Sequence, residues 1–119
     1  MRTNSTPSFP NNAALTRGTR VIMSGGYLAA ASATQDELGT IADTTLATDT
    51  MATIIPINES GVKQFVANGS VTQYATVYAA ASGKVSTTVG LRRGIALEAA
   101  SGDGAIIPVL VQVGSAAAL

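Results

Sequence analysis

Cysteine, histidine and tryptophan are all absent from this sequence of 119 residues, and two of these absences exclude whole classes of chemistry. Without cysteine the chain has no disulfide framework, thiol nucleophile, zinc finger or iron–sulfur site. Without histidine it lacks the most frequent general base and the most frequent transition-metal ligand. We therefore expect no enzyme activity, with no catalytic residues, no metal site and no cofactor.

Charge is scarce as well. Seven Lys and Arg residues balance seven Asp and Glu residues, so the net charge is +0. Binding to nucleic acid needs a basic surface, and no nucleic-acid partner is expected. No apolar run approaches the roughly 20 residues that cross a bilayer, and the polar first residues do not form the core of a signal peptide. The sequence thus predicts a protein made in the cytoplasm, with no membrane partner.

Aromatic side chains make up only 4% of the residues. The core must then consist of Val, Ile, Leu, Met and Ala, which bury less surface per residue than large rings. Small domains with modest cores often gain stability by association. We expect a homo-oligomer.

Short apolar runs alternate with Gly, Ser, Asn and Asp from Ala13 onward, a pattern typical of an all-β fold. The Ser24-Gly25-Gly26 turn predicts a hairpin, because glycine tolerates the positive φ of tight turns. The fold class expected is a small β-sandwich or barrel-like domain over residues 13–119. Strands are expected at Thr19–Met23, Tyr27–Ala30, Leu38–Ala42, Met51–Ile57, Val62–Ala67, Tyr74–Ala79, Lys84–Thr88, Gly94–Glu98 and Ala105–Val113.

Residues 1–12 differ from the rest, since they are mostly Pro, Asn, Ser and Thr with a single aromatic, Phe9. They predict an extended N-terminal arm that is ordered only on a partner. A frayed terminus without a role is the other interpretation.

The sequence also contains a possible internal duplication, with halves at about 13–60 and 69–113. Four collinear matches support it: Leu15–Val21 with Val71–Val77, Gly25–Leu28 with Ser82–Val85, Leu38–Ala42 with Arg93–Leu97, and Ala52–Ile57 with Gly104–Val109. Each half would be a small β unit that buries one apolar face against the other. Pro56 and Pro108 are predicted at equivalent sheet edges, because proline cannot donate a hydrogen bond to a neighbouring strand.

No catalytic pattern is present. The adjacent acids Asp36 and Glu37 would point to opposite faces of an extended segment, which indicates a solvated loop. The Ser101–Gly104 segment has one carboxylate and completes no calcium or phosphate motif, so a turn between strands is expected.

The order of segments in the second half is familiar. The matching residues are Val77-Tyr78, Ser82–Lys84, Gly94–Ala100, Gly102–Gly104 and Ile107–Leu110. In this order the chain resembles the small β-rich capsid decoration (cement) proteins of tailed bacteriophages. The resemblance implies a structural protein on the outer capsid surface of the virion, made in the host cytoplasm. It further implies a trimer that binds the major capsid protein and stabilises the head by bridging coat subunits.

Residues for coat-protein binding are predicted from the arm and from the arginines. Phe9 would enter an apolar coat pocket, and the arginines would pair with acidic coat groups, although a solvated pair at Arg92 and Arg93 is an alternative. The set is Arg2, Phe9, Pro10, Arg17, Arg20, Arg92 and Arg93. The alternative function is a small β carbohydrate- or surface-binding module on a phage particle.

Overall fold

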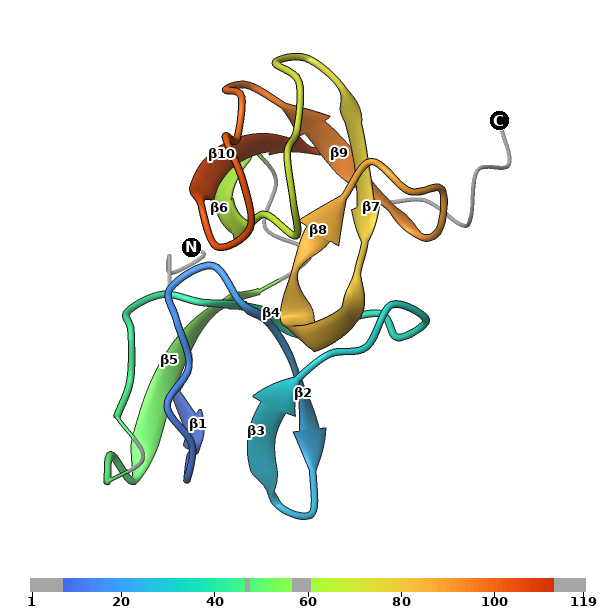
Figure 1. The fold of residues 1–119 in the computed structure, drawn as a ribbon. Coiled ribbons are helices and arrows are strands. Elements are labelled where there is room, and N and C mark those ends of the chain that lie inside the picture. The colour runs from blue at the N-terminus through green and yellow to red at the C-terminus, as the bar shows by residue number, and fades with distance from the viewer. Residues whose placement is uncertain (1–7, 47, 57–60, 113–119) are drawn as a thin grey trace, which may run out of the picture.

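The computed structural model describes residues 8–46, 48–56 and 61–112, which form ten strands and one short 3₁₀ turn (Figure 1). The first five strands are β1 (Ser8–Pro10), β2 (Arg20–Ser24), β3 (Tyr27–Ala30), β4 (Gly39–Ile41) and β5 (Met51–Pro56). The others are β6 (Val62–Val66), β7 (Thr76–Ala79), β8 (Val85–Ser86), β9 (Arg92–Ala96) and β10 (Ile106–Val111), with the 3₁₀ turn η1 at Ala81–Gly83. The predicted all-β fold is confirmed.

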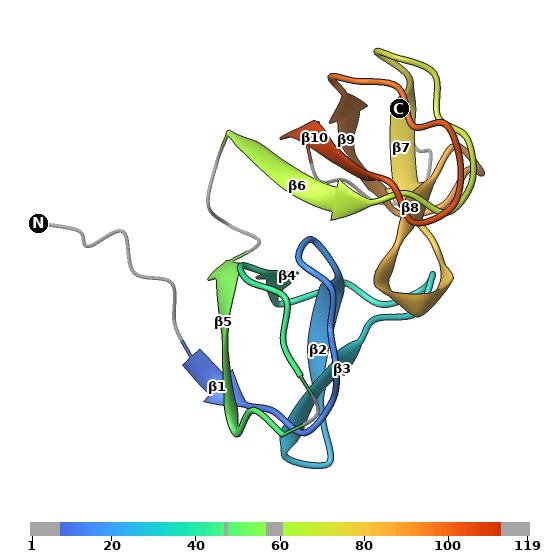
Figure 2. The same cartoon turned by 60° about the vertical axis from the view of Figure 1, so that its left-hand side comes forward.

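The strands form two antiparallel sheets with the same topology. The order is β1-β5-β4-β2-β3 in one sheet and β6-β10-β9-β7-β8 in the other. We call residues 8–56 the first lobe and residues 61–112 the second lobe. Figure 2 shows the two lobes stacked, with the β7–β8 connection reaching the first lobe. The two similar halves expected from the sequence are therefore two sheets of the same strand order.

The similarity extends to single hydrogen bonds in loops. The N–H of Gly18 donates to the carbonyl of Ile41 at 2.9 Å, and the N–H of Tyr74 donates to the carbonyl of Ala96 at 2.7 Å. Both donors have a positive φ, 90° for Gly18 and 70° for Tyr74. This bond places the first sequence match at equivalent positions in the two lobes. The second match agrees with the pairing of Met23 with Leu28 and of Ala79 with Val85, and the third with the pairing of Val21 with Gly39 and of Val77 with Gly94.

A glycine fixes the strand spacing in each sheet. A Cβ on Gly39 would lie 2.1 Å from the Ile55 carbonyl oxygen, and one on Gly94 would lie 2.1 Å from the Leu110 carbonyl oxygen. Only glycine permits these approaches of β4 to β5 and of β9 to β10. These two glycines occupy equivalent positions, and they define which residue of the first lobe corresponds to which residue of the second.

Each lobe has its own apolar core. The first-lobe cluster consists of Leu15, Val21, Leu28, Ile41, Ala52 and Ile54. The second-lobe cluster consists of Phe65, Ala67, Val71, Val77, Val85, Ala96, Ala100, Ile107 and Val109. A parallel bridge between Ala67 and Val85 joins the two ends of the second sheet, which closes that lobe into a small barrel.

The fourth sequence match is wrong in register. Ile54 pairs with Ile41 in the first lobe, and Val109 pairs with Ala96 in the second. Because Ile41 and Ala96 are equivalent, Ile54 corresponds to Val109 and not to Ile106. The two Ile-Ile-Pro runs resemble each other in sequence without occupying equivalent positions.

The prolines are not at sheet edges, contrary to the prediction. Pro56 ends β5 and Pro108 lies inside β10, and both strands have a neighbour on each side. Pro108 is tolerated because its neighbour is Leu97, just beyond β9: the Leu97 N–H donates to the Pro108 carbonyl at 2.9 Å. The Leu97 carbonyl accepts a hydrogen bond from Gln73 Nε2 at 3.1 Å. A side chain thus supplies the donor that proline lacks.

Residues 8–12 are not part of an arm. Phe9 in β1 lies opposite Ala52 of β5 and packs against the first-lobe core. Asn11 is buried, and its N–H donates to the Thr50 carbonyl at 2.9 Å. This segment is the counterpart of β6, since Phe65 likewise faces the second strand of its sheet, at Ile107. Residues 1–7 of the predicted arm lie outside the described residues.

Candidate functional site

The two lobes meet where glycine lets backbones approach. The Gly83 N–H, in the β7–β8 connection, donates to the Ala31 carbonyl at 2.7 Å. A Cβ on Gly83 would lie 2.5 Å from Thr19 Cγ2 and 2.7 Å from the Arg20 carbonyl oxygen. Gly18 approaches β6 in the same way, since its Cβ would lie 3.2 Å from the Gln64 carbonyl oxygen. The close approach of the two lobes therefore favours glycine at positions 18 and 83.

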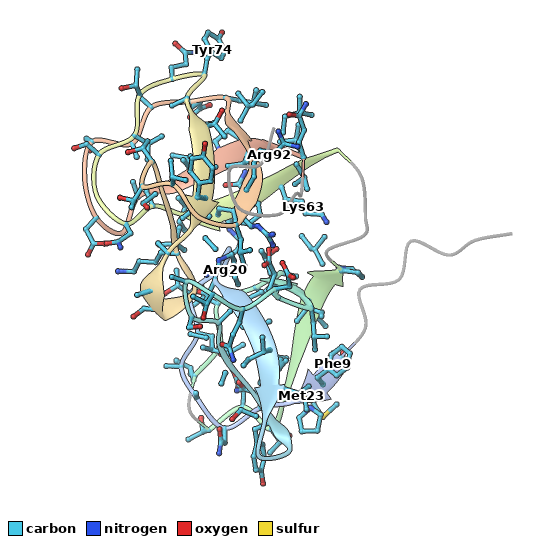
Figure 3. All side chains as sticks on the ribbon, turned by 90° about the vertical axis from the view of Figure 1, so that its right-hand side faces the viewer. Phe9, Arg20, Met23, Lys63, Tyr74 and Arg92 are labelled. Carbon is cyan, nitrogen blue, oxygen red and sulfur yellow. The ribbon has the colours of Figure 1, made fainter. Side chains whose placement is uncertain are left out.

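Arg20 is fully buried between the lobes (Figure 3). Its guanidinium uses all five N–H donors. The acceptors are the carbonyls of Lys84 (3.0 Å), Gln35 (3.2 Å), Ser32 (2.9 Å) and Ala80 (2.7 Å), and Oε1 of Glu37 (3.2 Å). Two of these carbonyls belong to the second lobe, so this side chain joins the lobes by hydrogen bonds.

Arg93 provides the matching contact from the second lobe. Its Nη1 donates to Glu37 Oε1 at 2.6 Å, and its Nη2 donates to Asp36 Oδ1 at 2.9 Å. Arg20, Glu37 and Arg93 have no exposed side-chain surface, whereas the Asp36 side chain is 73% exposed. One buried carboxylate therefore lies between two buried guanidinium groups, one from each lobe. We call Arg20, Glu37 and Arg93 the junction triad.

The junction triad joins the two lobes through buried ion pairs and hydrogen bonds. Burial lowers the pKa of Arg20, and the neighbouring Glu37 opposes this shift. The hydrogen bonds described for both arginines go to carboxylates and backbone carbonyls of the chain itself. Removal of one member would leave buried charge without a partner, which is costly.

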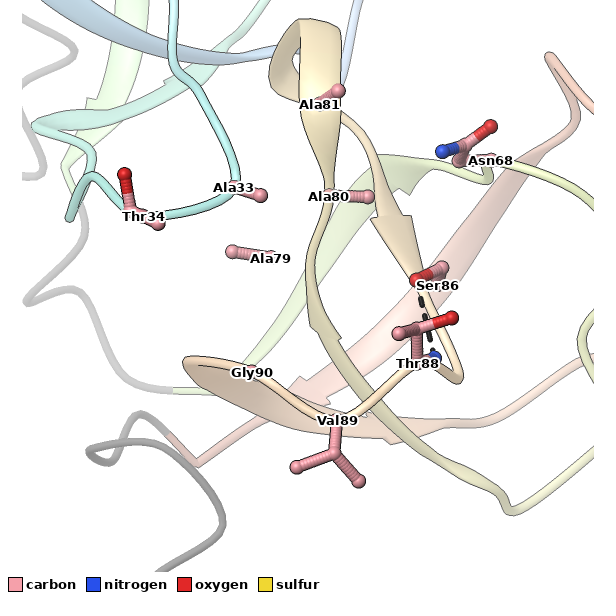
Figure 4. Close-up of a pocket in the computed structure, with 10 residues that line it drawn as sticks. All are labelled: Ala33, Thr34, Asn68, Ala79, Ala80, Ala81, Ser86, Thr88, Val89 and Gly90. Carbon is pink, nitrogen blue, oxygen red and sulfur yellow. Dashed lines mark hydrogen bonds between the residues drawn. The ribbon is translucent and has the colours of Figure 1, made fainter.

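A shallow cleft of about 330 Å³ lies beside the junction (Figure 4). Its lining is Ala33, Thr34, Asn68, Ala79, Ala80, Ala81, Ser86, Thr88, Val89 and Gly90. The Thr88 N–H donates to Ser86 Oγ at 3.2 Å. None of the described residues that line the cleft is charged, and their small side chains offer little for holding a charged ligand.

Three predicted coat-binding residues lie inside the protein, which corrects their assignment. Arg20 and Arg93 are fully buried in the junction triad, and Phe9 packs on the first-lobe core. Arg20 and Arg93 are therefore not available to a partner of the folded protein, and Phe9 is held in β1 with part of its surface exposed. The arginines were assigned to the surface because charge in a sequence usually indicates exposure, and Phe9 because the polar residues around it predicted an extended arm.

The other predicted residues have different positions. Pro10 ends β1 and is exposed, and Arg17 is exposed in the turn before β2. Arg92 Nε donates to the Gln112 carbonyl at 3.1 Å, so this arginine is partly engaged within the chain. Arg2 lies outside the described residues. The structure therefore does not gather the predicted set into one surface.

Glu37 is the residue that sequence reasoning misplaced most. It was expected in a solvated loop, but it is 3% exposed and contacts both buried arginines. A charge count over the loop could not indicate this, because the partners come from β2 and β9. The remaining signal was the scarcity of charge, which makes each charged residue worth testing for a buried role.

Within the described residues, no group of three or more Asp or Glu side chains could hold a metal ion. No helix in that part of the chain is long and apolar enough to span a bilayer. The exposed large apolar side chains are Met23, Tyr27, Leu38, Leu46, Met51, Val62, Tyr74, Val89 and Leu110.

Comparison with solved structures finds the same fold in a phage protein. The chain is similar to the N base of head fiber gp8.5 in bacteriophage phi29, with a TM-score of 0.70. The match covers 88% of this chain and 91% of that chain, at 13% sequence identity. No protein-family profile matches the sequence, and no curated protein matches it. At this identity the similarity establishes a shared fold of two lobes.

Proposed function

We propose that this chain is a structural protein of a phage virion, attached to the outer surface of the head as a decoration (cement) protein. The observation that carries the proposal is the shared fold: nearly the whole chain superposes on the N base of head fiber gp8.5. The order of residues in the second half, which resembles decoration proteins, supports the same class. The partner is the major capsid protein, and the role is to stabilise the head by bridging coat subunits.

The absence of an active-site pattern supports a structural role. The sequence has neither cysteine nor histidine. In the part of the chain that the structure describes, the buried charged groups of the junction triad bind each other and the backbone. We propose that the protein is not an enzyme and that it contributes contacts only.

A homotrimer is the proposed assembly. Few aromatic side chains are present to anchor the cores, and nine large apolar side chains are exposed among the residues that the structure describes. Association would cover part of this surface and add stability that a small core cannot supply.

The alternative of a carbohydrate-binding module has less support. Sugars usually stack on exposed aromatic rings, and the clearly exposed rings in the described residues are Tyr27 and Tyr74. Tyr27 begins β3, next to the β2–β3 turn that follows Met23, and Figure 3 shows Met23 and Tyr74 toward opposite ends of the molecule. Two rings at opposite ends do not form a stacking platform.

Cryo-electron microscopy of phage particles made with and without this protein tests the proposal. The expected difference is two-lobed β density on the outside of the head, at sites where coat subunits meet. Particles lacking the protein should release DNA at a lower temperature. Density on the tail, or no density on the head, would contradict the proposal. A glycan-binding screen of the purified protein tests the alternative.

A further inference from the structure

The contact between the lobes is asymmetric. Gly83, in the β7–β8 connection of the second lobe, packs against Thr19 and Arg20 of the first. Its counterpart in the first lobe is Gly26, in the β2–β3 turn, and a Cβ there would meet nothing within 4 Å. The lobes therefore use different surfaces on each other, as in a head-to-tail contact. One surface of each kind is left unoccupied.

We call the first surface the receiving face. In the first lobe it consists of Gly18, Thr19, Arg20, Ala31 and Ser32, which contact the second lobe or border that contact. The pairing of the strands identifies the equivalent residues in the second lobe, because Val21 lies opposite Gly39 as Val77 lies opposite Gly94. The counterparts, counted along the chain from the paired strands, are Tyr74, Ala75, Thr76, Thr88 and Val89.

We call the second surface the inserting hairpin. In the second lobe it is the segment 80–84, whose carbonyls of Ala80 and Lys84 accept hydrogen bonds from Arg20. Met23 pairs with Leu28 as Ala79 pairs with Val85, so the counterpart in the first lobe is the segment 24–27. This segment forms the free end of the β2–β3 hairpin.

Neither unoccupied surface contains a charged residue, and each contains one exposed tyrosine. In the receiving face of the second lobe, Tyr74 is 68% exposed and Val89 is 63% exposed. In the inserting hairpin of the first lobe, Tyr27 is 43% exposed, and Met23 beside it is 38% exposed. No charge would be desolvated when these surfaces meet. Tyrosine and methionine are enriched in protein interfaces.

Tyr74 provides an independent indication. It has a φ of 70°, whereas the equivalent turn in the first lobe has Gly18 at a φ of 90°. A non-glycine residue in this conformation costs about 1–2 kcal/mol, and such strain concentrates at functional positions. A tyrosine kept in a glycine position, with its ring in solvent, is explained by a contact outside the chain.

From these observations we propose that copies of this chain associate head to tail, and that each contact repeats the lobe–lobe contact found inside one chain. The receiving face of the second lobe binds the inserting hairpin of the next copy's first lobe. The occupant is a second copy because the interface already present within the chain continues onto surfaces of the same backbone geometry. This inference assigns surfaces to the self-association in the proposed function and rests on that part of it.

A repeated head-to-tail contact closes into a ring when the rotation between units allows it. Three copies would then form a ring of six lobes, in which contacts within and between chains alternate. The contact between chains would lack the junction triad, because Thr76 stands at the position of Arg20. Apolar burial alone would hold it.

Sedimentation equilibrium of the full chain tests the proposal with two variants and a control. Tyr27→Lys and Tyr74→Lys should each raise the dissociation constant at least about tenfold, as expected for an aromatic interface anchor. Tyr74→Gly should do the same while keeping the backbone of the turn, so a loss of association cannot be attributed to misfolding. Leu46→Lys, at a residue exposed outside both surfaces, should leave association unchanged.

Mixing the two lysine variants distinguishes a head-to-tail contact from a symmetric one. Each variant alone should be monomeric, but an equal mixture retains one intact contact and should form dimers that grow no further. A monomeric wild-type chain at about 100 µM, or a mixture that stays monomeric, would overturn the inference. Attachment to phage heads is measured separately, so a monomer that still decorates heads would refute this inference and leave the decoration role standing.

Discussion

Glu37→Ala is the most informative perturbation of the fold, because this carboxylate is shared by two buried arginines. Its Oε1 lies 2.6 Å from Arg93 Nη1 and 3.2 Å from Arg20 Nη1, and all three side chains are unexposed. The variant would leave two guanidinium groups buried together without the carboxylate. Because Arg20 belongs to the first lobe and Arg93 to the second, the loss acts directly on the junction.

The size of the effect follows from the burial. Two unit charges 4 Å apart attract by about 4 kcal/mol at an effective dielectric constant near 20. Removing one partner of a buried pair typically costs about 3–5 kcal/mol, since the remaining charge is uncompensated. We expect Glu37→Ala to lower the free energy of unfolding by that amount. At roughly 4 °C for each kcal/mol, the melting temperature should fall by about 10–20 °C.

Urea unfolding followed by circular dichroism measures this loss, with Asp36→Ala as the matched control. Asp36 also contacts Arg93, but its side chain is 73% exposed, and an exposed pair contributes at most about 1 kcal/mol. Glu37→Gln should fall between the two, because it keeps an acceptor and removes the charge. Equal losses for Glu37→Ala and Asp36→Ala, or a loss below about 1 kcal/mol for Glu37→Ala, would refute the view that the junction triad joins the lobes.

Three further predictions concern the strands. Gly94→Ala should cost more than about 4 kcal/mol or prevent folding, because its Cβ would lie 2.1 Å from the Leu110 carbonyl oxygen; Gly102→Ala, which meets nothing, should change stability by less than about 0.5 kcal/mol in the same urea assay. Deleting residues 2–10 removes β1, which pairs with β5, and should lower the melting temperature measured by circular dichroism; an unchanged melting temperature would contradict the role of β1 in the first sheet. Phe65→Ala should destabilise by about 3–5 kcal/mol, and Phe9→Ala by less, since Phe65 is fully buried and Phe9 is partly exposed; equal losses in urea unfolding would contradict this.

The sequence by itself determined the class of the fold and most of its strands. Alternation of apolar and polar residues has a period of two along a strand, so it is a local signal that survives without tertiary information. The Gly25-Gly26 turn was also predicted from a local signal, the tolerance of glycine for a positive φ, and both glycines have a positive φ. β1 was missed because three residues, one of them Pro10, are too few to show a period.

The duplication was visible in part for a similar reason. Matches anchored on strand glycines such as Gly39 and Gly94 were found in the correct register, because those positions require glycine in both lobes. The match of the two Ile-Ile-Pro runs was wrong, since apolar strand residues are interchangeable and carry no register of their own. The correct alignment of β5 with β10 follows from the pairing of Ile54 with Ile41 and of Val109 with Ala96 in the structure.

Only the tertiary structure decided where the charged residues lie. Arg20, Glu37 and Arg93 are far apart in the chain, and each alone indicates an exposed side chain. They become a buried group because the two lobes meet at β2 and β9, with a carboxylate between two guanidinium groups. The same is true of the exposed tyrosines: their place at opposite ends of the molecule follows from the stacking of the lobes, which local sequence patterns do not encode.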